Sequence, residues 1–237
     1  MGVRLLETPR SYAEMIAGTS GLVAYWRLGD RSGTTARDYA GRSHGTYNAG
    51  PVLGAQGALV NDLGTSVTFT TASSQYVASP LMNDLPLGTA KRTLECWVNS
   101  PTLPDTRQGY FGYGDAGANQ VVNMEYLPGQ GLYIVGYAAG DLAPSPPNVL
   151  INGLWHHIAV TYDGVTARSY LDGRQAGIGA RSWNTVSAGK VLGIGRQSYS
   201  DPPYYYVGGR IAEAAIYRRV LSALELAEHN AAGRGAL

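Results

Sequence analysis

Apolar and polar positions alternate along most of the chain, and this period of two predicts β-strands. The segment 92–98 (RTLECWV) shows the alternation most clearly. Turn dipeptides such as Asp163-Gly164 and Asp172-Gly173 separate the alternating segments. The predicted strands are 22–28, 66–70, 75–77, 92–98, 120–126, 132–137, 156–162, 166–171, 190–195 and 210–217. About ten short strands at nearly regular spacing are typical of a β-sandwich.

Two short segments follow a helical pattern instead, one near each end of the chain. Ser11 is a candidate N-cap with Glu14 three residues later, and Gly18 can end that helix. Ser222 and Glu225 form a second capping-box pattern. This second pattern predicts a helix from Ala223 to about Asn230.

The chain shows neither a linker nor an internal repeat, so we expect one sandwich domain at 21–237 with a helical N-terminal extension at 1–20. The proline-rich stretch 141–148 is short and lies between strands, which makes it a loop. The glycines of 112–117 match the spacing GxGxxG, but a strand pattern follows them, whereas a dinucleotide site requires a helix. We therefore expect a glycine-rich turn at 112–117.

The charge balance excludes several classes of partner. The chain carries 18 basic and 17 acidic residues, a net charge of +1, so it has no electrostatic signature of nucleic-acid binding.

No apolar run approaches a membrane span, and the N-terminus lacks the apolar core of a secretory signal. The single cysteine, Cys96, excludes an intramolecular disulfide and is expected to be buried. Synthesis and folding in a reducing cytoplasm is the simplest expectation.

Five segments together resemble one family. They are Tyr25–Asp30 (YWRLGD), Leu94–Val98 (LECWV), Trp155–Gly164 (WHHIAVTYDG), Tyr170–Gly173 (YLDG) and Gly209–Ser222 (GRIAEAAIYRRVLS). In this order and spacing they are similar to the laminin-G-like, concanavalin A-like lectin/glucanase superfamily. The resemblance covers roughly residues 21–230. It implies an all-β fold, an antiparallel two-sheet jelly-roll sandwich, which carries short N- and C-terminal helices here.

The resemblance also implies binding functions. Members of the family are commonly carbohydrate-binding or adhesion modules, and many hold one structural calcium ion. The run from Ser11 to Asp30 is similar to the start of such domains in tail or other virion proteins of phages that infect actinobacteria. This second resemblance implies a place in a phage particle.

Three carboxylates are the candidate ligands of a structural Ca²⁺, which prefers six to eight hard oxygens. Asp30 and Asp38 flank a loop that resembles the calcium loop of the family, and Glu213 matches an acidic position before the last apolar run. The chain departs from the family pattern at Ala212, where an aspartate usually precedes the glutamate. The alternative is that these acids cap turns and pair with nearby arginines.

Catalysis is not expected. Glucanases on this fold place carboxylates alternately on one strand, and neither Glu95 nor Glu125 has the second and third acid of that pattern. His156 and His157 are adjacent on a strand, so they point to opposite faces and cannot bind one metal ion together. We interpret both histidines as structural.

Aromatic residues near loops are the remaining candidates for binding. Tyrosine offers a flat apolar face and a hydroxyl group, which suits both sugar stacking and subunit interfaces. Burial in the sandwich is the alternative for each of them. The candidates are Tyr113, Trp183, Tyr199, Tyr204, Tyr205 and Tyr206.

The sequence therefore predicts a protein that works by binding. The first hypothesis is a non-catalytic structural or adhesion protein of a phage virion, a capsid decoration or minor tail protein. Its expected partners are other virion proteins, further copies of itself, a trimer in the first instance, and host cell-surface carbohydrate. The alternative is a stand-alone carbohydrate-binding module, which would be a monomer with a tyrosine-lined groove.

Overall fold

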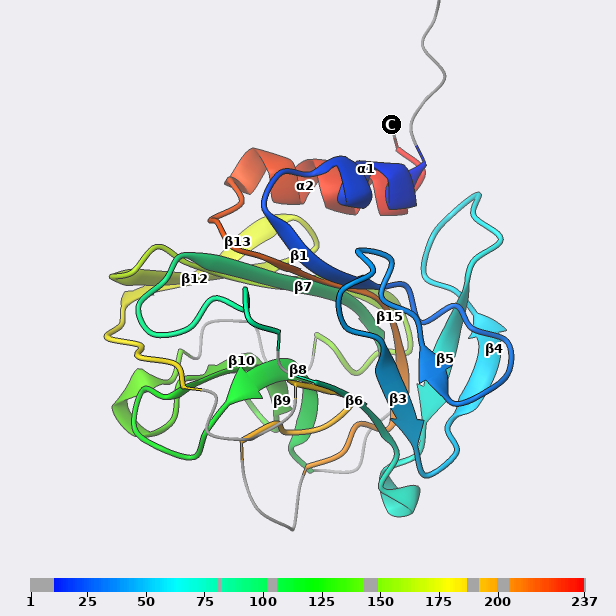
Figure 1. The fold of residues 1–237 in the computed structure, drawn as a ribbon, viewed down its shortest axis with the longest axis horizontal. Helices are drawn as coiled ribbons and strands as arrows, with labels where there is room; N and C mark the ends of the chain where they lie inside the picture. The colour runs from blue at the N-terminus through cyan, green and yellow to red at the C-terminus, as the bar shows by residue number, and fades with distance from the viewer. Residues whose placement is uncertain are drawn as a thin grey trace, which may run out of the picture.

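The structure is a computed structural model that describes residues 11–80, 82–101, 106–142, 149–186, 192–199 and 205–236. Its strands form two antiparallel sheets, stacked as the two layers of a sandwich (Figure 1). The strands are β1 (Leu22–Trp26), β2 (Thr35–Ala36), β3 (Gly45–Asn48), β4 (Val52–Gln56), β5 (Thr65–Phe69), β6 (Tyr76–Ser79), β7 (Arg92–Asn99), β8 (Gln108–Gly114), β9 (Val121–Leu127), β10 (Gly131–Val135), β11 (Trp155–Tyr162), β12 (Thr166–Leu171), β13 (Arg174–Ala180), β14 (Leu192–Ile194) and β15 (Gly209–Tyr217). The predicted all-β sandwich is confirmed.

The two sheets differ in strand order. Sheet A has the order β13-β12-β11-β7-β15-β5-β4, and β1 also pairs with β15. Sheet B has the order β10-β9-β8-β14-β6-β3-β2. Many neighbours in these sheets are distant in sequence, as in a jelly roll, so the chain passes repeatedly between the two layers.

The main core lies between the sheets and follows the period of two. In β7, Leu94, Cys96 and Val98 point into this core, where they meet side chains of sheet B such as Phe111 and Met124. Cys96 is fully buried there, as predicted. The alternate β7 residues must therefore lie on the outer face of sheet A.

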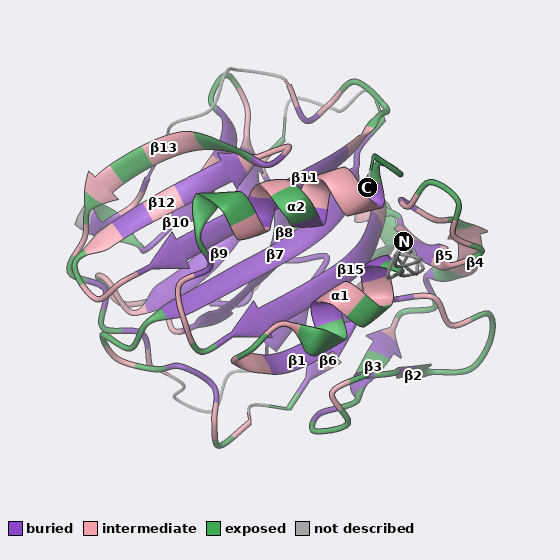
Figure 2. Cartoon of the chain, turned by 90° about the horizontal axis from the view of Figure 1, so that it is seen from above, coloured by how far each residue is buried: buried purple, intermediate pink, exposed green. Residues whose placement is uncertain are grey.

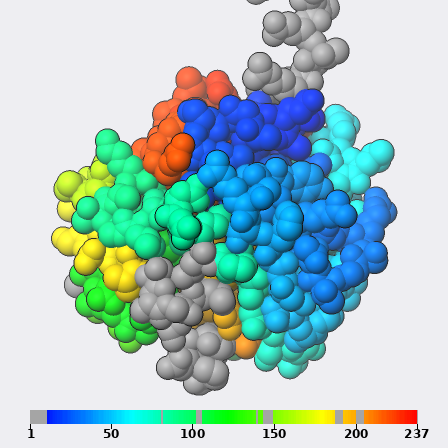
Figure 3. Space-filling view, viewed as in Figure 1, coloured from blue at the N-terminus to red at the C-terminus, as the bar shows by residue number. Residues whose placement is uncertain are grey.

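Two helices, α1 (Tyr12–Gly18) and α2 (Ala223–Gly233), cover that outer face (Figure 2). They lie side by side along the top of the molecule, α1 in blue and α2 in orange-red (Figure 3). Tyr12 and Ile16 of α1 and Leu226 of α2 are buried in a second apolar cluster against sheet A. Within the predicted N-terminal extension, α1 thus packs on the sandwich of its own chain.

Both predicted capping boxes are present, with Ser11 and Glu14 at α1 and Ser222 and Glu225 at α2. Helix α2 continues past Asn230 to Gly233, one turn beyond the prediction. None of the helices in the described parts of the chain is long and apolar enough to cross a bilayer.

Candidate functional site

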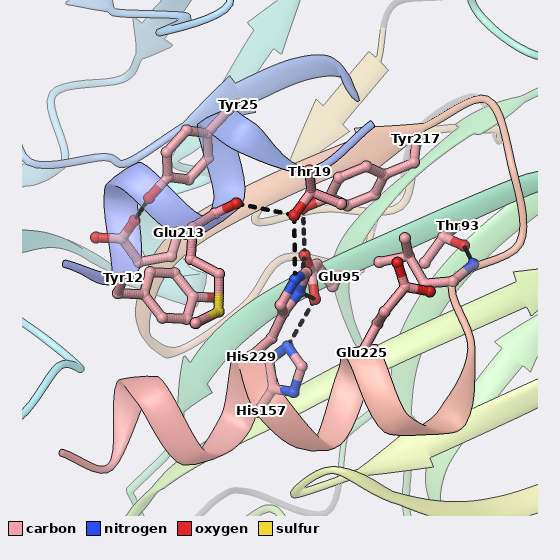
Figure 4. A network of polar contacts seen from close by, with 12 residues as sticks. Tyr12, Thr19, Tyr25, Thr93, Glu95, His157, Glu213, Tyr217, Glu225 and His229 are labelled. Carbon is pink, nitrogen blue, oxygen red and sulfur yellow. Dashed lines mark hydrogen bonds and ion pairs between the residues drawn. The ribbon is translucent and has the colours of Figure 1, made fainter. Parts of the chain in front are cut away.

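A buried carboxylate with two histidines lies between sheet A and the helices (Figure 4). Glu95 of β7 is 3.0 Å from Nε2 of His157 on β11 and 3.0 Å from Nδ1 of His229 on α2. Tyr217 of β15 donates its hydroxyl hydrogen to the same carboxylate at 2.7 Å. Glu95 and His157 are fully buried, and His229 is nearly so.

The charges of this cluster hold helix α2 against sheet A, and we refer to the cluster as the clamp. Burial alone would raise the pKa of Glu95, but the attraction of His229 and the hydrogen bonds from both histidines hold that pKa well below its usual range. Burial would lower the pKa of His229, and Glu95 outweighs it and raises that pKa. An ion pair at this position ties α2 to the sheet, and its carboxylate has no access to a substrate.

The predicted calcium ligand Asp38 holds a loop together through hydrogen bonds. It is buried, and its two carboxylate oxygens accept backbone N–H bonds from Tyr25, Ala40, Arg42 and Ser43 at 2.8–2.9 Å. Four donors occupy the lone pairs that a cation would require. This matches the turn-capping alternative stated for the sequence.

The other two predicted ligands also have protein partners. Asp30 accepts bonds from the backbone N–H of Arg37 and the hydroxyl of Tyr47. Glu213 accepts bonds from the Tyr25 hydroxyl and from the Arg27 guanidinium.

These contacts do not fit a shared calcium ion. In the residues described here, no group of three histidine, cysteine or acidic side chains could hold a metal. A guanidinium beside Glu213 would also repel a cation. Calcium binding therefore stays a prediction from the sequence, without support from this arrangement.

The structure corrects the prediction for three of the six aromatic candidates, which lie inside the protein. Trp183 is fully buried and donates its indole N–H to Gly140 O at 2.8 Å. Tyr113 is fully buried and donates to Pro86 O at 2.7 Å. Tyr199 is 2% exposed. Each ring finds a polar partner in the interior, so none of the three is open to a ligand.

The remaining aromatic candidates border an open cavity of about 560 Å³ beside the outer face of sheet B. Tyr205 and Tyr206 line it, and Tyr204 lies outside the described residues. The rest of the lining is Arg107, Leu127, Pro128 and two threonines, Thr71 and Thr106. Tyr205 is 44% exposed, which makes it the most accessible of the described aromatic candidates.

The backbone of β8 fixes the position of Tyr205. The Tyr205 carbonyl accepts N–H bonds from Gly109 at 3.0 Å and from Gln197 at 3.1 Å. A Cβ at Gly109 would come closer than 3.0 Å to the backbone of Arg196 and Gln197, so only glycine permits this approach. Gly109 thus allows the segment of Arg196 and Gln197, which shares the Tyr205 carbonyl with Gly109, to lie directly on β8.

Arg107 connects the cavity to a buried acid. Its Nε donates to Glu125 of β9, and its Nη2 donates to the Tyr199 hydroxyl at 3.2 Å. The guanidinium is also near two tyrosine rings, with its Cζ 5.4 Å from the centroid of Tyr205 and 5.7 Å from that of Tyr133. Because two hydrogen bonds and two cation–π contacts hold the guanidinium, Arg107 keeps a fixed orientation at the cavity wall.

Glu125 is fully buried beneath this arginine. Burial raises its pKa, and although Arg107 partly opposes this, the pKa reaches about 7. Nearby, Tyr133 donates its hydroxyl to Asp141 at 3.0 Å, and burial with this carboxylate raises the pKa of Tyr133 to about 12. The outer face of sheet B therefore carries a polar network whose protonation changes near neutral pH.

Sequence reasoning missed the central members of this network. Glu125 was considered only as a glucanase carboxylate, and Arg107 directly precedes β8, a strand that was not predicted. The expected glycine-rich turn at 112–117 is wrong in its first half, because Gly112–Gly114 belong to β8. The available signal was the period of two in β9, which places Asn123 and Glu125 on one face.

The fold and the tyrosine-lined cavity define a lectin-like sandwich domain. Residues 71–227 match the laminin-G family described as the concanavalin A-like lectin/glucanases superfamily, which is more than half of the chain. The chain belongs to this family.

Solved structures with 13–18% identity share the fold. Domain 4 of AbnA, an extracellular arabinanase from Geobacillus stearothermophilus solved with arabinotriose, aligns with TM-score 0.62 and 18% identity, over 88% of this chain and 98% of that one. A Trypanosoma rangeli sialidase aligns with TM-score 0.63 and 14% identity, over 91% of this chain and 33% of that one. The binding domain of Paraclostridial Mosquitocidal Protein 1 aligns with TM-score 0.60 and 13% identity, over 89% of this chain and 52% of that one.

Curated relatives are similar at a low level. Human and mouse neuronal pentraxin-2 are each 27% identical over 177 residues, or 67% of this chain. The chain spans about 40% of the length of these relatives.

Proposed function

We propose that this chain is a non-catalytic carbohydrate-binding module that stacks a sugar ring on Tyr205 in the cavity beside Arg107. The observation that carries the proposal is the exposed Tyr205 ring at the wall of a 560 Å³ cavity, held by two backbone hydrogen bonds and an arginine. A fixed aromatic face loses little conformational freedom when a sugar binds to it.

The composition of the cavity wall supports this function. Aromatic and aliphatic side chains can contact the C–H faces of a sugar, while the arginine and the two threonines offer hydrogen-bonding groups for its hydroxyls. The volume is within the range of small-molecule sites. The similar fold of the arabinanase domain solved with arabinotriose also supports a carbohydrate ligand.

The environment of the glutamates supports the absence of catalysis. Glu95, Glu125 and Glu213 are at most 2% exposed. Each is held by histidine or arginine, as described above. A pair of accessible carboxylates about 5–9 Å apart, which glycoside hydrolysis requires, would have to come from other groups.

A glycan panel tests the proposal with two variants. Tyr205→Ala removes the stacking face, and Tyr39→Ala removes a 58% exposed tyrosine of the loop after β2 as a matched control. We expect Tyr205→Ala to weaken binding about tenfold, equivalent to about 1.4 kcal/mol. Tyr39→Ala should leave binding unchanged. Absence of any glycan binding by the wild type, or equal binding by Tyr205→Ala, would refute the proposal.

We further propose that the module serves as a structural or adhesion protein of a phage virion and forms a homotrimer. The low charge content of 15% and the similarity of the run from Ser11 to Asp30 to virion proteins support this assignment. Light scattering on the purified protein should give a closed oligomer. A monomer at every concentration tested would refute self-association. Absence of the chain from purified phage particles would refute the virion role.

A further inference from the structure

The cavity presents a charged group, Arg107, and part of its guanidinium makes no hydrogen bond to the described residues. Arg107 is the only charged residue among the described residues that line the cavity. Its Nε and Nη2 have protein partners, whereas no hydrogen bond joins its Nη1 to any described residue. The side chain is 24% exposed. A positively charged donor group therefore faces the space beside the Tyr205 ring.

A guanidinium group is well suited to bind a carboxylate. Its planar N–H groups match the two oxygens of a carboxylate, and such charge-assisted bonds are about twice as strong as neutral ones. The rings of Tyr133 and Tyr205 already fix the orientation of Arg107, so little freedom remains to be lost on binding.

We propose that the cavity takes a saccharide unit that carries a carboxylate, such as a uronic acid, with this carboxylate bound by Arg107 and the sugar ring on Tyr205. The inference rests on the proposed carbohydrate-binding function and specifies its ligand class. Arg107 is at the cavity wall while its carboxylate partner Glu125 is buried behind it, and this arrangement favours an acidic sugar over a neutral one. Among the described lining residues, no aspartate or glutamate would repel it.

Glu125 adds a dependence on pH to this site. The groups that face it are Arg107, Tyr199 and Asn123, and Asp141 and Tyr133 lie close enough to share its field. A ligand carboxylate on the far side of Arg107 would repel ionised Glu125 and favour its protonated form. Binding would then take up a proton, so affinity would rise as the pH falls through the pKa of Glu125, which is about 7.

The size of this effect has an upper limit. One coupled proton changes the binding constant by at most tenfold per pH unit, and the dependence flattens once Glu125 is protonated in the free protein. For a group with a pKa of about 7, the affinity at pH 6 exceeds that at pH 8 by at most about tenfold.

Calorimetry with two matched trisaccharides tests the inference. Trigalacturonate and the corresponding neutral α-1,4-linked galactotriose differ in the carboxylates. We expect trigalacturonate to bind at least tenfold more tightly at pH 6, and to weaken by up to about tenfold at pH 8. Equal or tighter binding of galactotriose would overturn the inference and leave the proposed function standing.

Two variants and one control test whether Arg107 causes the preference for the acidic trisaccharide and whether Glu125 causes its pH dependence. Arg107→Gln should abolish the preference for the acidic trisaccharide, and exposed Arg174→Gln on β13 is the control that removes the same charge elsewhere. Glu125→Gln should bind trigalacturonate equally at pH 6 and pH 8, because the titrating group is gone. A cooperative unfolding transition well above the temperature of the calorimetry would show that each variant is folded.

The two proposals can fail separately. If trigalacturonate does not bind while another glycan binds in a manner that requires Tyr205, the acidic-sugar inference is wrong and the binding function stands. If no glycan of the panel binds to the wild type, both proposals fail. A preference for trigalacturonate that survives in Arg107→Gln would overturn the role of this arginine.

Discussion

The clamp beneath the helices allows a quantitative prediction for Glu95→Gln. This variant keeps the shape of the side chain but removes the charge that His157, His229 and Tyr217 share. The new amide also replaces one accepting oxygen with an N–H group, which cannot accept a hydrogen bond from the surrounding donors. At least one of the three partners therefore loses its bond. The change is therefore far from conservative at a site that is fully buried.

The magnitude follows from the number of bonds. A hydrogen bond to a charged group contributes about 1.5–3 kcal/mol, compared with about 1 kcal/mol for a neutral one. Three weakened or lost bonds give a decrease of about 3–5 kcal/mol in the free energy of unfolding, which also matches the usual cost of breaking a buried ion pair. For a chain of this size, such a decrease lowers the melting temperature by about 6–20 °C.

The pH dependence of this deficit has a defined sign. The lowered pKa of Glu95 stabilises the fold above the ordinary value of 4.5, and the raised pKa of His229 stabilises it below the ordinary value of 6.5. The difference between wild type and Glu95→Gln should thus be largest between these two values. It should shrink as the pH falls through the folded pKa of Glu95 or rises through that of His229.

Urea unfolding at pH 5.5 measures the effect. Glu228→Gln, at an exposed position of the same helix, is the control and should stay within about 0.5 kcal/mol of the wild type. A Glu95→Gln variant within 1 kcal/mol of this control would refute the ionic clamp. Equal deficits at pH 5.5 and pH 9 would refute the role of His229.

Further predictions concern packing, capping, protonation and metal binding. Gly233→Ala should lower stability by about 1–3 kcal/mol in urea unfolding, because its Cβ would come closer than 3.0 Å to Trp97. Ser222→Ala should cost about 1 kcal/mol in the same assay through loss of the α2 cap, and no change would contradict the observed capping box. The melting temperature should fall as the pH rises from about 5.5 to 8. Burial raises the pKa of Glu125 and Glu213 to about 7, so the folded chain holds these protons more tightly than the unfolded chain does. A rise in melting temperature would contradict the buried environments of these two glutamates. If the acids of the predicted calcium site keep the protein partners observed here, EDTA should leave the melting temperature unchanged, whereas a fall of several degrees would establish a cation site.

Strands with regular alternation could be predicted from the sequence. The segment 156–162 lies within the observed β11, and 166–171 coincides with β12. Successive β11 residues alternate between the two apolar clusters, with Ile158 and Val160 in the main core and Ala159 in the second cluster, so local pattern and tertiary structure agree. The adjacent histidines also point to opposite faces as expected, with His157 bound to Glu95 and His156 to Asp172.

Glycine-rich strands could not be predicted in this way. β8 (QGYFGYG) and β13 (RQAGIGA) resemble turns, because glycine has a low intrinsic preference for strands. In β8, Gly109 is required by the close approach of the segment around Gln197, which is a tertiary contact without a local signal. The same contact positions Tyr205, so the sequence could indicate the aromatic loop but not its cavity.

The charged partners of the buried glutamates could not be predicted from the sequence either. Glu213 adopts a φ of 55° at the bulge in β15, which turns its carboxylate toward Arg27 and Tyr25. A sequence motif shows the acid but neither the bulge nor the arginine, so a metal ligand and an ion-pair partner look the same. The pairing of Arg107 with Glu125 is hidden for the same reason.

Both ends of the described chain lie at the helix-covered face of sheet A (Figure 1). The Tyr205 cavity, in contrast, lies beside the outer face of sheet B. A copy tethered through either end would therefore direct its cavity away from the point of attachment. Several copies fixed side by side on one support would all face the same way. Weak single-site contacts could then add to a strong multivalent attachment to a glycan-coated surface, with an effective local concentration set by the spacing of the copies.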